Sequence, residues 1–493
     1  MYRPTIGLEI HIELRTRSKM FCSCKNDSEE KEANLNVCPI CLAHPGTLPA
    51  INKEAVQMVL KAALALHCRV NRKTFFERKS YFYPDLPKNY QISQYALPLA
   101  EKGFLCIKSG DKEKKIRINR VHLEEDTGRL IHPKGKGYSL VDFNRAGVPL
   151  MELVTEPDIE SAEEARNFAK ELRLVIRYLG ISKADMEKGE MRCEVNISLR
   201  SGKDKELGTK VEVKNLNSLR SVEKAVKHEI ERQLKILESG GEIIQETRGW
   251  SDKEEKTFSQ RTKEESDDYR YFPEPDLPPL ELAQDFVTEI EKSLPELPAE
   301  KRERFQKEYG LNSKEVEIYI SQPRLGNYFE EVVSELRNWV KEKTMKKEIK
   351  KEEFFRLAKL AANYISTDLQ FFLKGKPFSE KEFPVSPENF AEFISMIHLK
   401  EISSRIAKKL LEKMFQSGGD PSQIIKEEEM VLLSDENLIF KVVKEVITEN
   451  PKAVEDYKKG KEAAIQFLLG KIMAKTKGNA DPAAAKKILQ DTL

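Results

Sequence analysis

The stretch that decides the fold is residues 6–14, which read IGLEIHIEL. Its apolar residues occupy every second position, and glycine, glutamate and histidine fill the positions between them. An alternation with a period of two predicts a β-strand with one buried face. The other face then presents Glu9, His11 and Glu13 in one row. Carboxylates in such a row repel one another, so the row indicates either a solvated strand face or a site that holds a cation or a basic ligand.

The same alternation recurs at residues 120–125, 139–144, 191–199 and 209–214. The polar positions of these stretches mix carboxylates with basic or amide side chains: Arg120, His122, Glu124, Asp142, Asn144, Arg192, Glu194, Lys210, Glu212 and Lys214. One polar strand face is ordinary, but several together predict a sheet whose open face is a charged binding surface. Such a surface suits Mg²⁺ with phosphate, because oxygen ligands hold the ion and bases neutralise the phosphate.

Length and composition limit the classes of protein that fit. The chain has 493 residues, of which 34% are charged and 39% hydrophobic, and its formal net charge is +2. This length predicts two to four domains. No run of about 18 apolar residues occurs, so no membrane span is expected. The strand pattern begins at once and leaves no room for a signal peptide, so we expect a cytoplasmic protein. With so small a net charge, any contact with a nucleic acid would depend on local basic patches rather than on an overall positive potential of the protein.

Four of the seven cysteines lie close together, with the spacing C-x-C-x13-C-x2-C. They are Cys22, Cys24, Cys38 and Cys41. In a reducing compartment this spacing favours a zinc site, because a CPIC turn lets two thiolates bind one tetrahedral ion. A disulfide pair or a redox-active CxxC is the alternative. Four thiolate ligands would leave no position open for a substrate, so the predicted zinc ion is structural.

The character of the sequence changes near residue 293. Before it, strand patterns and loops dominate, with helices predicted after Ser161 and over 217–238. After it, helical patterns dominate, and GGDP at 418–421 marks a second break between residues 405 and 420. The lysines near the end suit either contact with a phosphate backbone or a solvated helix face: Lys471, Lys475, Lys477, Lys486 and Lys487.

Conventional nucleotide-binding signatures are absent from the sequence. It contains neither GxxxxGK[ST] nor a GxGxxG that follows a strand. A GxSxG nucleophile motif is also absent. If this chain binds a nucleotide, the charged strand faces are the best candidates for the binding site.

Several long motifs resemble one known family. They are GLEIHIEL at 7–14, RKSYFYPDLPKNYQISQ at 78–94, HLEED at 122–126, DFNRAGVPLME at 142–152, KNLNS at 214–218 and DDYRYFPEPD at 267–276. Together they are similar to the B subunits (GatB family) of the bacterial aspartyl/glutamyl-tRNA(Asn/Gln) amidotransferases, along the whole chain. The related archaeal E subunits carry a large insertion for which this chain has no room, which favours the B subunits.

The resemblance implies one component of a tRNA-dependent amidotransferase. ATP would phosphorylate the side-chain carboxylate of Glu-tRNA(Gln) or Asp-tRNA(Asn), and ammonia would then displace phosphate to leave an amide. The ammonia would arrive through a channel from the partner amidase (GatA), in a heterotrimer that also contains a small third protein (GatC). The implied cofactors are ATP and Mg²⁺, in addition to the structural Zn²⁺ that the cysteine spacing predicts.

The resemblance also implies roles for individual residues. The catalytic Mg²⁺ site is expected at His11, at Glu124 or Glu125, and at Glu152, with Glu125 assigned to the ligand set. Nearby candidates on polar strand faces are Glu9 and Glu194. The residues expected near the channel mouth and the acyl end of the tRNA are Lys79 and Lys88. The residues expected to contact phosphate or substrate are Arg192, Glu194, Lys210, Lys214 and Arg270. A structural ion pair is the alternative for each.

The fold that the resemblance implies is α+β and has three parts. A β-rich cradle domain at 1–293, with a zinc knuckle at 22–41, precedes an all-helical domain at 294–407. A small helical tail at 408–493 is similar to the YqeY-type module that contacts the tRNA body. Two other functions compete with this one: a free-standing ATP-dependent ligase, and a non-catalytic tRNA-binding scaffold that only stabilises the amidase.

Overall fold

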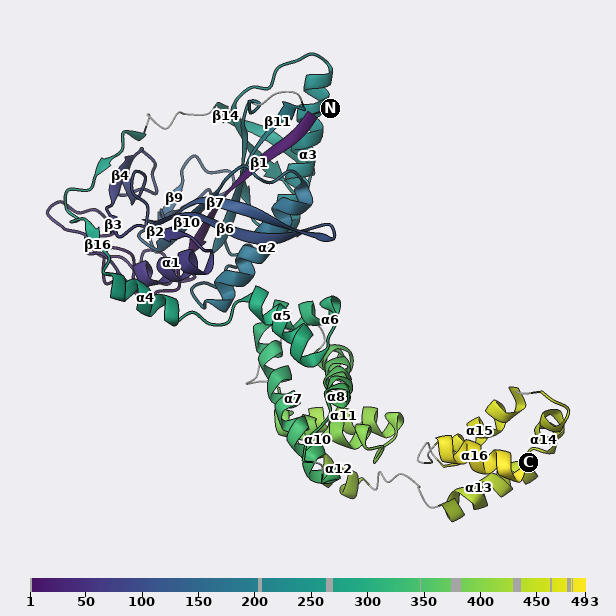
Figure 1. Cartoon of the computed structure of the whole chain (residues 1–493). Helices are drawn as coiled ribbons and strands as arrows, with labels where there is room; N and C mark the ends of the chain where they lie inside the picture. Colours follow the sequence, from purple (N-terminus) through teal and green to yellow (C-terminus); the bar gives the residue numbers. More distant parts are fainter. Residues whose placement is uncertain are drawn as a thin grey trace. The chain divides into compact units, whose positions relative to one another are not determined.

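The computed structural model describes residues 2–202, 206–262, 269–345, 347–373, 383–428, 436–461, 463–476, 480 and 482–493. The chain divides into two compact units, Met1–Pro298 and Ala299–Leu493 (Figure 1). The first combines a large sheet with helices and the second is helical, which confirms the α+β class. Residue 408, the predicted start of the tail, lies within helix α11 (Ser404–Ser417), and the three-part division stays a prediction. None of the described helices has the length and hydropathy to cross a membrane.

A nine-stranded sheet forms the centre of the first unit, in the order β14-β13-β12-β11-β1-β10-β7-β6-β2. Its neighbouring strands are antiparallel except β12 and β13, which run parallel. The bounds are β1 (Tyr2–Glu13), β2 (Arg69–Val70), β6 (Ala100–Ser109), β7 (Lys112–Glu125), β10 (Pro149–Thr155), β11 (Met191–Ser201), β12 (Val211–Leu216), β13 (Glu246–Ser251) and β14 (Lys256–Thr262). The strands predicted at 6–14, 120–125, 191–199 and 209–214 are confirmed as parts of β1, β7, β11 and β12.

Helices bury the apolar face of this sheet. They are α1 (Lys53–Ala65), α2 (Ala162–Tyr178) and α3 (Leu219–Glu238), and Figure 1 shows α2 and α3 along the sheet. Ile10 of β1 is fully buried in the same core as Phe168 of α2 and Val222 of α3. Ser161 caps α2, the helix predicted after this residue: its Oγ accepts the Glu164 N–H at 3.1 Å. Since the helices take the apolar face, the polar side chains of β1 project from the opposite face.

Smaller sheets flank the large one. One contains β4 (Glu77–Ser80), β5 (Tyr90–Ser93) and β15 (Phe272–Pro273), a second β3 (Lys73–Thr74) and β16 (Leu280–Glu281), and a third β8 (Arg129–Ile131) and β9 (Leu140–Asp142). The stretch 139–144 was expected to add a polar face to the main sheet, and this expectation was wrong. Its strand β9 pairs with β8 alone, and Asp142 and Asn144 instead accept the N–H groups of Asn34 and Asn36 at 3.0 and 2.9 Å.

The remaining helices follow the last strand, β16, in the chain. Helix α4 (Gln284–Lys292) closes the first unit. The second unit contains α5 (Pro298–Tyr309), α6 (Ser313–Ser321), α7 (Pro323–Thr344), α8 (Lys351–Tyr364), a π-helical turn (Ile365–Leu369), α9 (Gln370–Leu373), α10 (Pro387–His398), α11 and α12 (Pro421–Glu427). It ends with α13 (Glu436–Glu449), α14 (Pro451–Lys458), α15 (Ala463–Lys475) and α16 (Pro482–Thr492).

The last four helices pack around a core of their own. Val443 and Leu468 are fully buried there, together with Leu489. Among the lysines highlighted above, Lys475 binds Glu445 and Glu449 of α13 at 2.8 and 2.6 Å, so its charge is neutralised within the tail. The side chains of Lys486 and Lys487 are exposed, and Lys477 lies outside the described residues.

Candidate active site on the open face of the sheet

Four adjacent strands bring a row of charged side chains together. The pairing places His11 of β1 opposite Glu152 of β10 on one side and Arg192 of β11 on the other. Glu152 is in turn opposite His122 of β7. Residues that face one another in paired strands project to the same side of a sheet. The four side chains therefore form one row across the open face, close to the end of β1 and the start of β11.

Glu152 is the centre of this row. Its Oε2 lies 3.4 Å from His11 Nε2 and 3.3 Å from His122 Nε2. His11 Nε2 is also 3.8 Å from Glu9 Oε1 and 3.8 Å from Glu124 Oε1. Glu152 and Glu124 are 3% and 2% exposed, so both carboxylates are held away from bulk water. Their mutual repulsion is strong at this depth unless a positive charge separates them.

The charges of the cluster shift the pKa values of its members. Burial alone would lower the pKa of His11, but the hydrogen bond and charge of Glu152 and the charges of Glu194 and Glu124 raise it to about 9. Burial would raise the pKa of Glu152, but the two imidazoles hold it well below its usual range. Burial and the charges of Glu152 and Glu194 raise the pKa of Glu9 to about 7. The raised pKa values of His11 and Glu9 mean that the negative charges of the cluster favour bound protons, which is typical of a site for a cation.

Three overlapping groups of side chains could hold a divalent ion. Within each group the ligand atoms lie within 4.8 Å of one another: Glu9, His11 and Glu152; His122, Glu124 and Glu152; Glu9, Glu194 and Glu212. Carboxylate oxygens are the ligands that Mg²⁺ prefers, and Mg²⁺ usually keeps several waters besides one or two carboxylates. The donor set therefore fits Mg²⁺, with Glu9 and Glu152 shared between groups.

Glu125 has different surroundings from its neighbour Glu124. Its carboxylate accepts from Lys88 Nζ at 2.7 Å and from the Ile92 N–H at 3.1 Å. Successive side chains of a strand point to opposite faces. Glu124 therefore joins His11 and Glu152, whereas Glu125 does not. In the expected Mg²⁺ ligand set Glu125 stood beside His11 and Glu152; its carboxylate lies outside the three groups, and its role at the metal stays a prediction.

Basic and aromatic side chains border the cluster. Lys79 is half-buried, and although burial lowers its pKa, the charges of Glu124, Tyr271 and Glu152 raise it overall. Its Nζ lies 5.0 Å from the centre of the Tyr269 ring. The rings of Tyr271 and Tyr95 stack at 4.6 Å. A lysine and several aromatic rings therefore lie beside the carboxylates, as a phosphate and a base or sugar would require.

The other predicted substrate contacts have mixed outcomes. Arg192 lies in the row but binds Asp126. Lys214 Nζ is 2.9 Å from Glu194 Oε2 and 3.7 Å from Glu212 Oε1, so this lysine belongs to the edge of the cluster. Two residues are exposed and form no ion pair with a described residue: Lys210 and Arg270.

Three residues of the cluster were placed on polar strand faces by the sequence but were given no individual role in the site. His122 and Glu212 both occupy polar positions of alternating stretches, and His122 is two residues before Glu124. Arg120, two residues earlier again, places its guanidinium nitrogen 3.3 Å from Glu152 Oε1. The alternation put all three on polar strand faces, because residues separated by two share a face, but it did not show which side chains of other strands they meet.

The four clustered cysteines meet as the spacing predicts. Their sulfurs lie within 4.8 Å of one another, and Cys38 and Cys41 are 3.9 Å apart at Sγ as free thiols. Four sulfurs that each lie about 2.3 Å from a tetrahedral zinc ion are about 3.8 Å from one another. The Cys38 N–H also donates to Cys41 Sγ at 3.1 Å. This arrangement fits a zinc ion and does not contain a disulfide.

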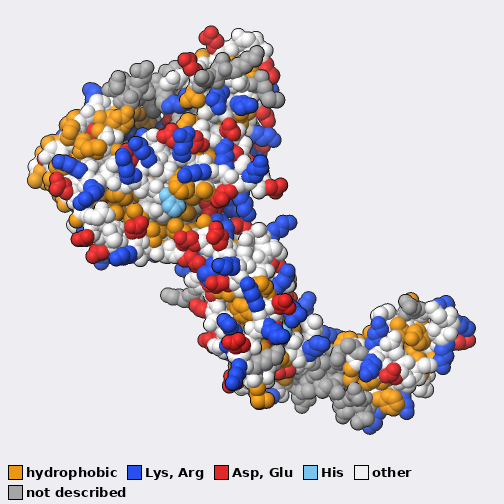
Figure 2. All heavy atoms as spheres, viewed as in Figure 1, with side chains coloured by type: hydrophobic (Ala, Val, Ile, Leu, Met, Phe, Trp, Pro, Cys, Tyr) orange, Lys and Arg blue, Asp and Glu red, His pale blue; other side chains and the backbone are white. Residues whose placement is uncertain are grey.

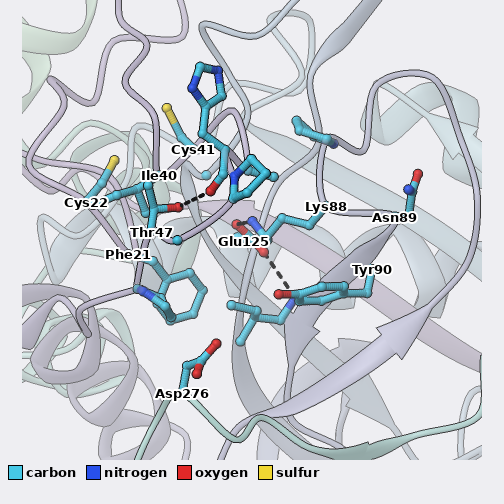
Figure 3. A pocket seen from close by; sticks show the side chains of 18 residues that line it. Phe21, Cys22, Ile40, Cys41, Thr47, Lys88, Asn89, Tyr90, Glu125 and Asp276 are labelled. Atoms are coloured by element: carbon cyan, nitrogen blue, oxygen red, sulfur yellow. Dashed lines mark hydrogen bonds and ion pairs between the residues drawn. The ribbon is translucent and has the colours of Figure 1, made fainter.

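A pocket of about 350 Å³ separates this knuckle from β5 (Figure 3). Its lining includes Phe21, Cys22, Cys41, Lys88, Tyr90 and Glu125. Figure 3 shows Lys88 extended towards Glu125 on one side and the sulfurs of Cys22 and Cys41 on the other. The pocket therefore lies between the cysteine knuckle and the strand that carries Glu124 and Glu125.

Comparison with known proteins decides the family. A family profile described as the GatB/GatE catalytic domain matches residues 4–288, and a second, named for GatB and Yqey and described as the GatB domain, matches 342–493. This chain belongs to the GatB family. The first match contains the whole charged cluster and the cysteine knuckle, and the second contains the helices α13–α16. The family predicted from the sequence motifs is confirmed, as is the YqeY-like nature of the end of the chain.

GatB relatives match along the full length. The B subunits of the aspartyl/glutamyl-tRNA(Asn/Gln) amidotransferases from Persephonella marina, Carboxydothermus hydrogenoformans and Thermotoga maritima are 47%, 45% and 45% identical to this chain. Each alignment covers 100% of this chain and 99% of the relative. Because these relatives are named as one subunit of an enzyme, they work in complexes with other subunits.

Proposed function

We propose that this GatB protein activates and amidates the side-chain carboxylate of Glu-tRNA(Gln), of Asp-tRNA(Asn), or of both. Its membership of an amidotransferase family supports the reaction. The observation that carries the assignment of the site is the convergence of Glu9, His11, Glu124 and Glu152 from three strands within a few ångströms. A scaffold that only bound tRNA would not need buried carboxylates at such mutual cost.

The proposed reaction has two steps. A carboxylate is a poor electrophile because an oxide would have to leave. In the first step a side-chain carboxylate oxygen attacks the γ-phosphorus of ATP, the bond to the β-γ bridging oxygen breaks, and ADP leaves. In the second step ammonia attacks the acyl carbon, inorganic phosphate leaves with the former carboxylate oxygen, and a proton is lost from nitrogen. The products are the amide on its tRNA, ADP and phosphate.

The charged cluster supports the first step. Glu9, His11 and Glu152 would hold Mg²⁺, which when bound neutralises charge on the nucleotide phosphates. Lys79 would supply a further positive charge beside them, because it faces Glu124 and Glu152. Burial strengthens these interactions and excludes water, which would otherwise compete for the phosphoryl group.

The second step needs ammonia from a partner. We propose that the partner amidase releases it from glutamine, in a heterotrimer with the small third protein. The pocket lined by Lys88 and Glu125 is the candidate for its arrival, because it adjoins the strand end that also carries Glu124. The reaction uses a tRNA and other translation components, so we place the complex in the cytoplasm.

The tail is the proposed site for the body of the tRNA. Acidic and basic side chains are intermixed on the face seen in Figure 2, in keeping with the net charge of +2. Recognition would therefore use a few separated lysines and the shape of the tRNA rather than one large basic surface. Lys486 and Lys487 are candidates because both are exposed on α16.

The test is a single-turnover assay of the assembled complex with γ-labelled ATP and Glu-tRNA(Gln) or Asp-tRNA(Asn). Replacing Glu152 (Glu152→Gln) should slow transfer of the label to the aminoacyl group by at least about 100-fold, because it removes a buried charge from the phosphoryl-transfer site. The control is Glu160→Gln, an exposed carboxylate of the same unit, which should leave the rate within about twofold. An unchanged rate for Glu152→Gln would reject the assigned site and favour the scaffold.

A second experiment addresses the free-standing ligase. The isolated chain, given ATP, Mg²⁺ and the misacylated tRNA with glutamine as the nitrogen source, should form much less amide than the complex does, because glutamine hydrolysis belongs to the partner. An ammonium salt in place of glutamine should restore amide formation by the isolated chain. Equal use of glutamine by the isolated chain would show that the partner is not needed.

A further inference from the structure

Lys19 has an unusual position for a lysine. It is 0% exposed and belongs to the largest fully buried side chains of the protein. Its Nζ donates to the Phe143 carbonyl at 3.2 Å and lies 3.8 Å from Cys41 Sγ. It forms no ion pair with any carboxylate of the described residues. A buried ammonium group without a counter-charge is strongly unfavourable, so this lysine needs a negative partner that its carbonyl contact does not supply.

The cysteine knuckle offers that partner. A zinc ion with four thiolates carries a net charge of 2−, and this charge lies in a partly buried place, since Cys41 is itself 4% exposed. Two groups already donate to Cys41 Sγ, the Lys19 ammonium and the Cys38 N–H. Of these two only Lys19 brings a full positive charge. The single positive charge of the lysine therefore offsets half of the 2− charge of the metal site, and the site supplies the counter-charge that the lysine lacks.

The same side chain connects the knuckle to the loop that precedes β10. Gly147 of this loop lies against both residues: a Cβ added to it would be in ordinary van der Waals contact with Lys19 Cδ at 3.5 Å and with Cys41 Cβ at 3.6 Å. Its carbonyl accepts the Met20 N–H at 2.7 Å, and its own N–H donates to the Asp126 carbonyl at 2.9 Å. The carboxylate of Asp126 binds Arg192, which lies in the charged row. A continuous set of contacts thus runs from the knuckle to the open face of the sheet.

We propose that Lys19 is the positioning residue of the zinc knuckle: it offsets part of the negative charge of the metal-bound thiolates and ties the knuckle to the loop at residues 143–148. This inference rests on the proposed zinc site. Charged or hydrogen-bonded groups behind the ligands of a metal commonly change its affinity 10- to 100-fold when they are replaced. Lys19 acts here through Cys41 and does not touch the substrate.

The first experiment measures zinc affinity by chelator competition, after the zinc content of the unmodified protein has been determined. Lys19→Met removes the charge and the donor, and Lys19→Gln keeps a donor without the charge. Both should raise the dissociation constant of zinc roughly 10- to 100-fold. The matched control is Lys25→Met, which removes an exposed lysine from the same loop and should change the constant less than about twofold. Affinities of Lys19→Met and Lys19→Gln within about twofold of the unmodified protein would overturn the proposal, and a zinc-free unmodified protein would overturn both it and the zinc site.

Two further measurements separate charge compensation from simple packing. In the cobalt-loaded protein, Lys19→Met should shift the thiolate-to-metal charge-transfer band, because Cys41 Sγ loses its donor, and an unshifted band would contradict the contact. If Lys19→Met does not fold, the double variant Lys19→Met/Cys41→His tests the proposal instead. Histidine is a neutral ligand, so it reduces the net negative charge of the zinc site from 2− to 1− and removes the need for the lysine. Recovery of folded, metal-bound protein supports the proposal, and failure of this compensation overturns it.

The link to the loop has its own readout. Hydrogen exchange of the amides of Ala146, Gly147 and Val148 should accelerate when zinc is removed, and to a similar degree in Lys19→Met, because the loop loses its attachment. Exchange in a peptide from α7 of the second unit serves as the internal control. Equal protection of the loop with and without zinc would refute the connection.

Discussion

Glu124 and Glu125 are adjacent in the sequence and have opposite surroundings. Glu124 faces His11 and His122, whereas Glu125 binds Lys88 and the Ile92 N–H. The motif HLEED alone does not separate their roles, because both residues are acidic and both are buried. The pleat of β7 and its pairing with β10 decide which of them reaches the metal-binding groups.

We predict that the two glutamates differ in their effect on the Mg²⁺ requirement. Glu124→Gln should raise the Mg²⁺ concentration needed for half-maximal ATP-dependent amidation at least about tenfold, because it removes a charge from the ligand groups. Glu125→Gln is the matched control and should leave this concentration within about twofold. The measurement is the rate of the assembled complex against Mg²⁺ concentration, with ammonium salt as the nitrogen source. The reverse pattern would return Glu125 to the metal site.

A second prediction concerns acid stability of the helical unit. Glu330 binds Lys301 Nζ at 2.9 Å and Arg304. Burial raises its pKa, but the hydrogen bonds of Arg304 and Lys301 hold it below its usual value of 4.5. A lowered folded-state pKa means that the stabilisation is complete above about pH 4.5 and is lost as the pH falls through the folded value. Its expected size is about 1 kcal/mol, because the carboxylate is partly solvated.

The measurement is the fluorescence of Trp339 in α7 during acidification, in a Trp250→Phe background so that it reports on this unit. Glu330→Gln should lower stability at about pH 6 and flatten the pH dependence between about pH 5 and 3. Glu331→Gln, an exposed neighbour on the same helix, should do neither. The same pH dependence in Glu330→Gln as in the unmodified protein would assign the effect to other carboxylates.

Strands and helices whose apolar residues recur with a clear period could be predicted from the sequence. The strands β1, β7, β11 and β12 follow from alternation, and α2 follows from its cap and apolar stripe. The order β11-β1-β10-β7 was not predictable, because it pairs residues of β1 with partners that are far away in the sequence, and a local period carries no information on such pairing. The stretch 139–144 was wrongly assigned to the main sheet for the same reason: alternation predicts a strand but does not show which strand it pairs with.

The same limit explains what was found of the site. His11, Glu124 and Glu152 were identified from motifs, whereas the role of Glu212 depends on the antiparallel pairing of β11 with β12, which places Glu212 opposite Asn196. The Arg192–Asp126 pair joins two segments that are 66 residues apart, and neither segment contains a signal for the other. Which side chains meet across two strands can be predicted only when the pairing register of those strands is known.

The cap of α2 gives a prediction at this scale. Ser161→Ala should destabilise the first unit by about 1 kcal/mol, because the Glu164 N–H loses its acceptor at the start of the helix. The thermal transition of this unit should fall by about 2–4 °C. The matched control is Ser161→Asp, which keeps a capping oxygen and should stay within about 1 °C. An equal loss in both variants would show that packing rather than capping matters at this position.

The molecule as a whole consists of a catalytic unit and a helical unit, each with a separate core. The last four helices bury Val443, Leu468 and Leu489 among themselves. Changes on the surface of the tail should therefore leave the chemistry of the sheet intact. This separation makes the proposed tRNA contacts testable without disturbing the site of phosphoryl transfer.

We predict that replacing Lys486 and Lys487 together by Gln weakens tRNA binding and lowers its salt dependence. Two lost phosphate contacts should reduce the slope of log affinity against log salt by about 1–2. The control is the pair Lys459→Gln and Lys461→Gln, whose ammonium groups already bind Glu455 and Asp456 at 2.8 and 2.9 Å. Affinity is measured with the assembled complex over a range of salt concentrations. Equal slopes for the Lys486/Lys487 variant and the unmodified protein would place tRNA contacts elsewhere.

The central place of β1 in the sheet has a consequence during synthesis on the ribosome. β1 ends at Glu13, but its two neighbours, β10 and β11, end at Thr155 and Ser201. At roughly 5–20 residues per second, the edge that pairs with β10 stays unpaired for about 7–30 s and the edge that pairs with β11 for about 10–40 s. Its apolar side chains must be shielded for that time, so we expect this protein to need nascent-chain chaperones more than one whose first strand pairs with its immediate successor.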